Sequence, residues 1–225
     1  MKKGFFKFIS IIFTAILFTS NFCSLNVFAA EENVSFFNDE DIKEMSELYE
    51  TSSEYIENNT SIERISAKLN QLNAMEGITE IIEHESYTEI TVTKNIYLDD
   101  QNKIPMGTVT HYIKPNSSIQ TRALADKTYH EYMYIGVAVL NQYVEYTEQV
   151  LNLNQISARI NDAYGTYNGV LSGSSDTNAS FGVFSYSPWA RTIFEVSIVG
   201  YGQVTMRAST SANNYGVWKT DWAFA

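Results

Sequence analysis

The chain has 225 residues, with 26 acidic side chains, 15 basic ones and a single cysteine, Cys23. A single cysteine excludes a disulfide within the chain, and the length suffices for one sizeable hydrophobic core or two small ones. The acids are concentrated, because residues 31–100 hold 18 acidic and four basic side chains, a net charge of −14, whereas residues 101–225 are neutral. A negative field of this size argues against binding to nucleic acid or to anionic lipid.

The first 30 residues have the pattern of a secretory signal peptide. Lys2, Lys3 and Lys7 precede an apolar run over residues 8–18, which is too short to span a bilayer as a helix. Small residues at Ala29 and Ala30 indicate cleavage after residue 29. We therefore expect residues 1–29 to be removed, and a secreted, extracellular protein that keeps neither a membrane anchor nor a cysteine. Together with its composition, this favours a Gram-positive source.

Helical spacing of apolar residues begins soon after the leader. Asn38 and Asp41 match a capping box, and the pattern predicts a first helix from Asp39 to Glu57. Thr60 and Glu63 match a second capping box and start another apolar stripe, which Gly77 should end in a left-handed conformation. Two helices joined by a short turn are expected to pack on each other or on a sheet.

Beyond Gly77 the apolar period changes from helical to two. Alternation over Tyr87–Leu98 and Ile104–Ile113, around the polar loop Leu98–Lys103, predicts a β-hairpin. The loop residues Asp99, Asp100 and Asn102 carry oxygens that suit calcium, but they lack the ligand number of an EF-hand, so an ordinary turn is the better interpretation. Pro115–Thr121 is either a linker or a surface loop.

An apolar run follows within a tyrosine-rich segment, Lys127–Thr147. Its centre, Met133–Leu140, is unbroken by polar residues and rich in β-branched side chains. We expect one long strand here, buried on both faces at its middle, and the rest of the fold to be organised around it.

The remaining chain reads as short strands separated by turns. Asn152–Asn154 is turn-like, Gln155–Tyr164 alternates as a strand, and Gly169–Ala179 has the composition of an exposed loop. A short strand is predicted over Phe181–Tyr186.

The clearest alternation lies between Arg191 and Arg207. Thr192, Phe194, Val196, Ile198, Val204 and Met206 share one face, together with Gly200 and Gly202, where a bulge would need glycine. A last strand, Tyr215–Phe224, places Trp218, Trp222 and Phe224 on one side.

Helices first and strands afterwards is the order of an α+β fold. We expect two N-terminal helices followed by a mainly antiparallel β-sandwich or curled sheet. The expected organisation is an acidic helical hairpin plus β-hairpin over residues 30–115 and an antiparallel β domain over residues 122–225, which together could form one continuous domain.

No sequence motif indicates catalysis. His84, His111 and His130 are separated by 27 and 19 residues, which matches no short zinc-ligand motif, so half-exposed strand histidines are the better interpretation. There is no GxSxG, SxxK or HExxH motif, and the acids of the neutral half are scattered. We therefore predict no catalytic residue, no metal and no cofactor.

Aromatic residues are the candidates for binding. Rings on an exposed sheet face hold sugars or proteins in many extracellular modules, although tryptophans more often fill cores. The candidates are Trp189, Trp218, Trp222, Tyr132 and Tyr134. The expected function is non-enzymatic binding of an extracellular protein or glycan. The alternatives are a β-rich membrane-active toxin or bacteriocin and, third, a secreted hydrolase.

Overall fold

The structure, a computed structural model, describes residues 34–115, 127–151, 155–168, 172–198 and 202–225. The chain divides into two units, Met1–Val34 and Ser35–Ala225, and all that follows concerns the second. Its helices are α2 (Asp39–Leu48), α3 (Ser53–Asn59) and α4 (Ile62–Ala74). The predicted signal peptide and residues 116–126, which include most of the predicted linker or loop, lie outside the described residues.

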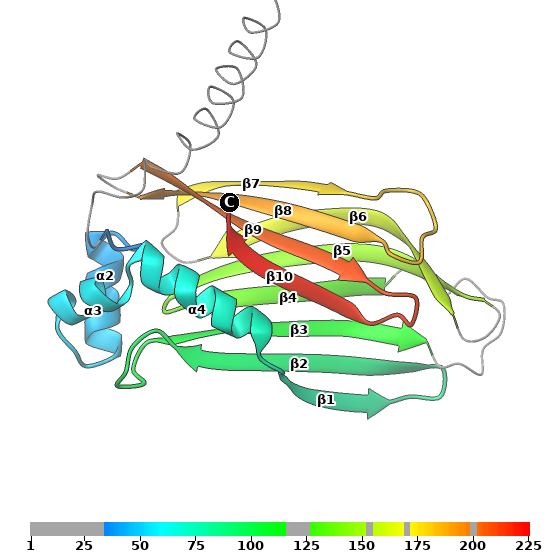
Figure 1. Ribbon diagram of the computed structural model, residues 1–225, viewed down its shortest axis with the longest axis horizontal. Coiled ribbons are helices and arrows are strands. Elements are labelled where there is room, and N and C mark those ends of the chain that lie inside the picture. Colours follow the sequence, from blue (N-terminus) through cyan, green and yellow to red (C-terminus); the bar gives the residue numbers. More distant parts are fainter. Residues whose placement is uncertain (1–33, 116–126, 152–154, 169–171, 199–201) are drawn as a thin grey trace, which may run out of the picture. The chain divides into compact units, whose positions relative to one another are not determined.

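In the part of the chain that the structure describes, ten strands follow the helices and form two antiparallel sheets. They are β1 (Ile78–Glu83), β2 (Tyr87–Tyr97), β3 (Pro105–Pro115), β4 (Lys127–Ile135), β5 (Ala138–Val150), β6 (Ile156–Asn168), β7 (Ser172–Ala179), β8 (Trp189–Ile198), β9 (Gly202–Ala212) and β10 (Trp218–Phe224). One sheet has the order β1-β2-β3-β4-β5-β6 and the other β10-β9-β8-β7 (Figure 1). The mainly antiparallel α+β fold is therefore confirmed, and β3 pairs with β4 across residues 116–126.

The N-terminal helices differ from the expectation in number and in their ends. The Asn38–Asp41 capping box is confirmed, but the expected helix Asp39–Glu57 is two helices, because Glu50 has a left-handed φ of 49° between them. Ser61, not Thr60, caps α4, since its side chain accepts the N–H of Arg64.

Gly77 also has a different role from the one predicted. Helix α4 ends at Ala74 with an extended cap residue, Met75, and Gly77 is not left-handed. A Cβ on Gly77 would instead lie 2.5 Å from Val92 Cγ1, so glycine permits the close approach of the chain to β2 as it enters β1.

The predicted hairpin of β2 and β3 is confirmed, with Tyr97 paired to Pro105 beside the turn. The sequence pattern missed β1, which pairs along its whole length with β2. Its residues, ITEIIE, do not alternate in polarity, which explains the omission.

The expected long central strand is wrong. Lys127–Val150 forms two strands, β4 and β5, and the turn between them, Gly136–Val137, lies inside the supposedly buried octet. Gly136 has a φ of +56° and Val137 a negative φ, the pattern of a type II′ hairpin turn. Glycine at the first turn position permits the reversal, and the apolar octet becomes two strand ends that are buried side by side.

Two predictions for the following chain are also wrong. Ser172–Ala179, assigned to a loop, is strand β7, paired with β8. Phe181–Tyr186, assigned to a strand, makes only single bridges to β6, Ala158 to Ser185 and Ile160 to Phe181. The serines and glycine of β7 carry no apolar pattern, so its strand state depends on pairing with β8 rather than on composition.

The faces of the C-terminal strands follow the prediction, but their bounds do not. The alternating stretch between Arg191 and Arg207 is divided between β8 and β9, which pair with each other, and the last strand begins at Trp218 rather than at Tyr215. Phe194, Val196, Val204 and Met206 are buried on one face of β8 and β9, and their neighbours Glu195 and Gln203 are exposed. Strand β10 buries Trp218 and Trp222. Residues 199–201, including Gly200, lie outside the described part.

Side chains of the two sheets meet in one core. Tyr112, Tyr129 and Tyr146 of the larger sheet cluster with Trp218 of the smaller one. Polar groups also cross between the sheets: Gln142 Nε2 donates to Thr192 Oγ1 at 2.9 Å, and Tyr129 and Thr220 hydroxyls lie 2.5 Å apart. Helix α4 lies beside β10 (Figure 1), where Asn73 bonds the backbone N–H and C=O of Trp222. Among the described residues, no helix is both long and apolar enough to cross a membrane.

Candidate binding surface

The three candidate tryptophans occupy two different environments. Trp218 and Trp222 are 4% and 1% exposed, whereas Trp189 is 43% exposed. The ring of Trp218 lies 4.6 Å from that of Tyr146, and the indole N–H of Trp222 donates to Glu131 Oε1 at 3.2 Å. Because both rings are enclosed in the core, only Trp189 of the three presents a surface for binding.

Exposed apolar side chains gather at the ends of the strands farthest from the helices. We name this cluster the aromatic tip; it comprises Phe181, Val183, Phe184, Tyr186, Trp189, Tyr215 and Val217. It comes from two connections, the segment between β7 and β8 and the turn between β9 and β10, which Figure 1 shows at the same end. Clusters of exposed apolar side chains mark interaction sites in soluble proteins.

Backbone and side-chain hydrogen bonds fix the two connections of the tip. Ser185 exchanges two backbone bonds of 2.9 Å with Ala158, and Ser180 N donates to Trp189 O at 2.9 Å. In the other connection, Asn213 Oδ1 accepts the N–H groups of Tyr215 and Val217 at 2.9 and 3.1 Å. The rings of the tip therefore project from a backbone that is held in place.

The tip is uncharged. Neither 180–189 nor 213–217 contains an acidic or basic residue, and the guanidinium of Arg159 from β6 lies 5.2 Å from the centre of the Phe184 ring. That contact shields one face of Phe184 and helps to anchor it. An uncharged, ring-bearing surface suits a neutral ligand.

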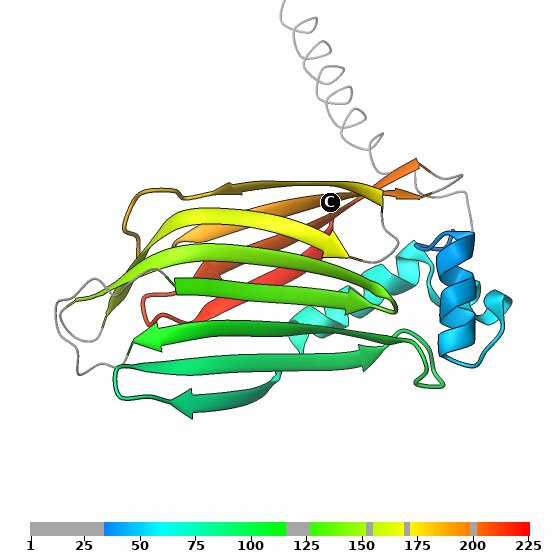
Figure 2. The same ribbon diagram turned by 180° about the vertical axis from the view of Figure 1, so that it is seen from behind.

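Tyr132 and Tyr134 lie elsewhere, on the face of the larger sheet that points away from the smaller one. Figure 2 shows that no described element covers this face. Adjacent strands bring further rings beside them: Tyr164, Tyr143 and His130 stack in sequence at centroid distances of 4.9 and 4.2 Å, and His130 lies 5.7 Å from Tyr132. We call these five residues the ring ladder. Because three of its members stack on one another, they offer their edges rather than their faces.

The pairing of the strands also brings the three histidines together. His111 faces His130 across β3 and β4, and Glu89 lies 3.2 Å from His84 Nε2 and 3.9 Å from His111 Nε2. Partial burial lowers the pKa of His130, the nearby His111 lowers it further, and a hydrogen bond to Asn141 opposes both. Within the described ranges, no three His, Cys, Asp or Glu side chains form a group suited to a metal ion.

Glu131 of β4 and Glu148 of β5 are buried carboxylates that act as structural partners. Glu131 accepts the hydroxyls of Thr110 and Tyr129 and the indole N–H of Trp222. Burial raises the pKa of Glu131, and these hydrogen bonds oppose the rise. Glu131 therefore links strands of both sheets through hydrogen bonds to side chains of the core, which is a structural role.

The second buried carboxylate, Glu148, forms an ion pair with Lys127 at 3.2 Å. Burial raises the pKa of Glu148 and lowers that of Lys127, and in each case the partner's charge opposes the shift. Trp218 Nε1 points toward Glu148 without reaching hydrogen-bond geometry. The pair lies next to Tyr112 and Tyr146, whose pKa values burial raises and Glu148 raises further.

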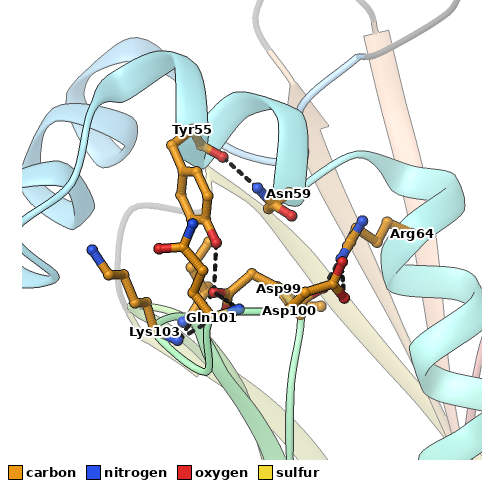
Figure 3. Close-up of polar contacts among 9 residues, drawn as sticks. Tyr55, Asn59, Arg64, Asp99, Asp100, Gln101 and Lys103 are labelled. Carbon is orange, nitrogen blue, oxygen red and sulfur yellow. Dashed lines mark hydrogen bonds and ion pairs between the residues drawn. The ribbon is translucent and has the colours of Figure 1, made fainter.

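The loop that suggested calcium, Leu98–Lys103, is a turn ordered by the side chain of Asp99, and we call it the Asp99 turn. Figure 3 shows the carboxylate of Asp99 facing Tyr55 of α3, whose hydroxyl donates to Asp99 Oδ2 at 2.8 Å. The N–H groups of Gln101, Lys103 and Ile104 also donate to this carboxylate. Burial acts to raise the pKa of Asp99, but the hydrogen bonds from Ile104, Tyr55 and Lys103 outweigh it and lower the pKa. Asp100 pairs with Arg64 at 3.2 Å. The oxygens of Asp99 thus order the turn and fasten α3 to it.

Comparisons with known proteins identify no relative: no family model, no curated protein and no solved structure matches the chain. Sequence reasoning selected one member of the aromatic tip, Trp189, and two of the ring ladder. It missed Phe181, Phe184, Tyr186 and Tyr215, although a run of aromatic residues among serines and glycines was a visible signal.

Proposed function

We propose that this protein is secreted by a Gram-positive bacterium and acts without catalysis, as a module that binds a neutral extracellular glycan on the aromatic tip. The single observation that carries the proposal is the gathering of seven exposed apolar side chains, five of them aromatic, on two uncharged connections. The two sheets with one shared core support the β-sandwich expected from the sequence, which presents such connections from a rigid body.

The chemistry of the tip favours sugar over an anionic or cationic ligand. Aromatic faces stack on the C–H faces of sugar rings, and Trp189 and Tyr215 are the most suitable by size and exposure. Ser185, Ser187 and Asn214 alternate with the rings and carry hydroxyl and amide groups that bond sugar hydroxyls. The ring ladder is less suited to this purpose, because its rings cover one another.

Retention on insoluble glycans tests the proposal. The wild-type protein should be retained on at least one of peptidoglycan, chitin and cellulose. The Trp189→Ala, Tyr215→Ala double variant should bind the same glycan with at least tenfold lower affinity. Tyr97→Ala is the matched control, because Tyr97 is also exposed but lies beside the Asp99 turn. Equal retention of both variants, or none by the wild type, would refute the proposal. Hydrolytic turnover that persists through purification would refute the absence of catalysis.

One feature of the tip favours a second candidate, a membrane-active protein. Phe181, Val183 and Phe184 lack a polar group, and side chains of this kind insert into the lipid interface. Co-sedimentation with zwitterionic phosphatidylcholine liposomes and leakage of a trapped dye at micromolar protein would support this function. Binding to glycans with intact liposomes would exclude it.

A further inference from the structure

Strand β1 is an unprotected sheet edge, and the other edges are not. Asn73 bonds the outer edge of β10. Side chains join β6 and β7: Ser175 Oγ of β7 donates to Gly165 O of β6, and Gly173 N of β7 donates to Tyr167 Oη of β6 at 3.2 Å. Ser185 and Phe181 bridge to β6. In both views β1 borders the larger sheet with no described element beyond it (Figures 1 and 2).

The composition of β1 is that of a docking strand. All six of its residues are exposed, and Ile78, Ile81 and Ile82 are 73%, 60% and 57% exposed. Soluble proteins protect such edges with lysine, proline or a bulge. Strand β1 has no lysine or proline, and its register with β2 is continuous.

The hydrogen-bond pattern shows which backbone groups are available. His84 N donates to Tyr87 O at 2.9 Å, so residues 84 and 87 form a hydrogen-bonded pair. Because such pairs alternate along an antiparallel ladder, Ile82, Glu80 and Ile78 bond β2. The N–H and C=O groups of Thr79, Ile81 and Glu83 therefore point outward from the sheet.

The acidic charge of β1 favours a cationic partner strand over a second copy of the chain at this edge. Glu80 and Glu83 form no ion pair within the described ranges, and residues 31–100 carry a net charge of −14. A second copy of the chain would bring two such acidic strands together. A cationic strand would instead neutralise them, since oppositely charged cross-strand neighbours are stabilising.

We propose that β1 binds an extended, cationic segment of a partner protein, which adds to the sheet as a seventh, antiparallel strand. Side chains directly opposite each other share a face, so the segment needs lysine or arginine opposite Glu83 and Glu80 and apolar residues opposite Ile82, Ile81 and Ile78. Read along the partner, the pattern is basic, apolar, apolar, basic, polar, apolar. This site is independent of the aromatic tip.

A synthetic peptide tests the proposal directly. The probe is a fluorescein-labelled peptide, Ser-Lys-Val-Val-Lys-Thr-Val-Ser, and its control has glutamate in place of both lysines. The lysine peptide should bind in fluorescence anisotropy at least tenfold more tightly than the control, and added salt should weaken it. On binding, the N–H groups of Thr79, Ile81 and Glu83 should gain protection from hydrogen exchange, whereas those already bonded to β2 should change little.

Three variants separate strand pairing from simple charge attraction. Ile81→Pro removes an outward N–H while leaving the bonds to β2, and should weaken the lysine peptide at least tenfold. Ile81→Ala keeps that N–H and should weaken it less. The double variant Glu80→Lys, Glu83→Lys should reverse the preference toward the glutamate peptide, which gives a readout that does not depend on loss of binding.

Three outcomes would overturn the proposal. The first is equal binding by wild type and a folded Ile81→Pro variant, which would indicate attraction to acidic groups alone. The second is retention of the lysine preference by the charge-reversed variant. The third is a dimer in analytical ultracentrifugation that Ile81→Pro dissociates and the lysine peptide does not, which would assign the edge to a second copy.

Discussion

Aromatic residues have opposite roles in the core and at the tip. In the core, Trp222 is tied to Glu131 and packs against Phe194 at a centroid distance of 5.8 Å, and Trp218 packs against Tyr129 and Tyr146. At the tip, Trp189 is held through its backbone, and its ring is exposed. The comparison indicates that ring composition alone does not identify a binding surface, because what matters is whether the ring or only its backbone is engaged.

The largest difference in folding stability should appear between tryptophans of the two regions. Trp222→Ala should lower the free energy of unfolding by about 4 kcal/mol, because it opens a cavity and removes a donor from Glu131. Trp189→Ala should change it by no more than about 0.5 kcal/mol, as is usual for exposed sites. Urea denaturation followed by circular dichroism measures both, and similar losses would contradict the comparison.

The hydrogen bonds of Glu131 in the core should contribute nearly as much to the free energy of unfolding as the ring of Trp222. Glu131→Ala should cost about 3 kcal/mol, since it leaves the indole N–H of Trp222 buried without an acceptor and removes the carboxylate that accepts the hydroxyls of Tyr129 and Thr110. Glu131→Gln retains an acceptor and should cost less. If the alanine variant unfolds at the same urea concentration as wild type, these hydrogen bonds contribute nothing to stability.

Folding stability should depend on pH, whereas glycan binding by the aromatic tip should not. Burial raises the pKa of Asp41 to about 6; the nearby Glu44 and Glu40 raise it too, and a hydrogen bond from Asn38 opposes them. A carboxyl with a folded pKa above its unfolded value of 3.8 stabilises the fold below about pH 4, and this contribution is lost as the pH rises through about 6. Asp41→Asn should therefore stabilise the protein by about 1 kcal/mol at pH 7 and have little effect at pH 4.

The tip carries no titratable group apart from tyrosine hydroxyls, so glycan retention should be constant between about pH 5 and pH 8. Thermal unfolding of wild type and Asp41→Asn across this range, beside retention of both proteins, measures the two responses. A parallel change in stability and retention would show that the tip is coupled to the body.

A much smaller loss of stability than those of the core variants is expected in the turn that carries Tyr215. Asn213→Ala removes the acceptor of two backbone N–H groups, but these groups are exposed and water replaces it, so the expected loss is about 1 kcal/mol or less. Retention on glycan should fall more than stability, because Tyr215 loses its fixed position. Asn213→Asp keeps the acceptor and serves as the control.

Local sequence patterns correctly predicted the elements that have one apolar face and one polar face. Alternation in β2, β3, β8 and β9 and the Asn38 cap predicted strands, faces and a helix start that the structure confirms. Strand β7 and the β4–β5 turn were missed for opposite reasons. The first has no apolar residue before its last one, Ala179, and the second places a single glycine inside an apolar run, where composition indicates continuity.

The surfaces were less predictable than the strands. Trp189 and Trp218 are each the first residue of a strand, β8 and β10, and no local pattern distinguishes the exposed ring from the buried one. The ring ladder depends on pairings such as His130 with Tyr143 and Tyr143 with Tyr164, which are set by strand order and register. Neither follows from spacing along the chain, because cross-strand neighbours are distant in sequence.

The sequence by itself determined the acidic front segment, the helix cap, the alternating strands and the lack of a disulfide, since each depends on residues close along the chain. Tertiary structure alone decided that Trp218 and Trp222 are enclosed while Trp189 is open, that the three histidines share one face, and that β1 is left as an edge. The physical reason is that burial and edge exposure depend on which strands become neighbours, and that choice is made by the packing of the whole core.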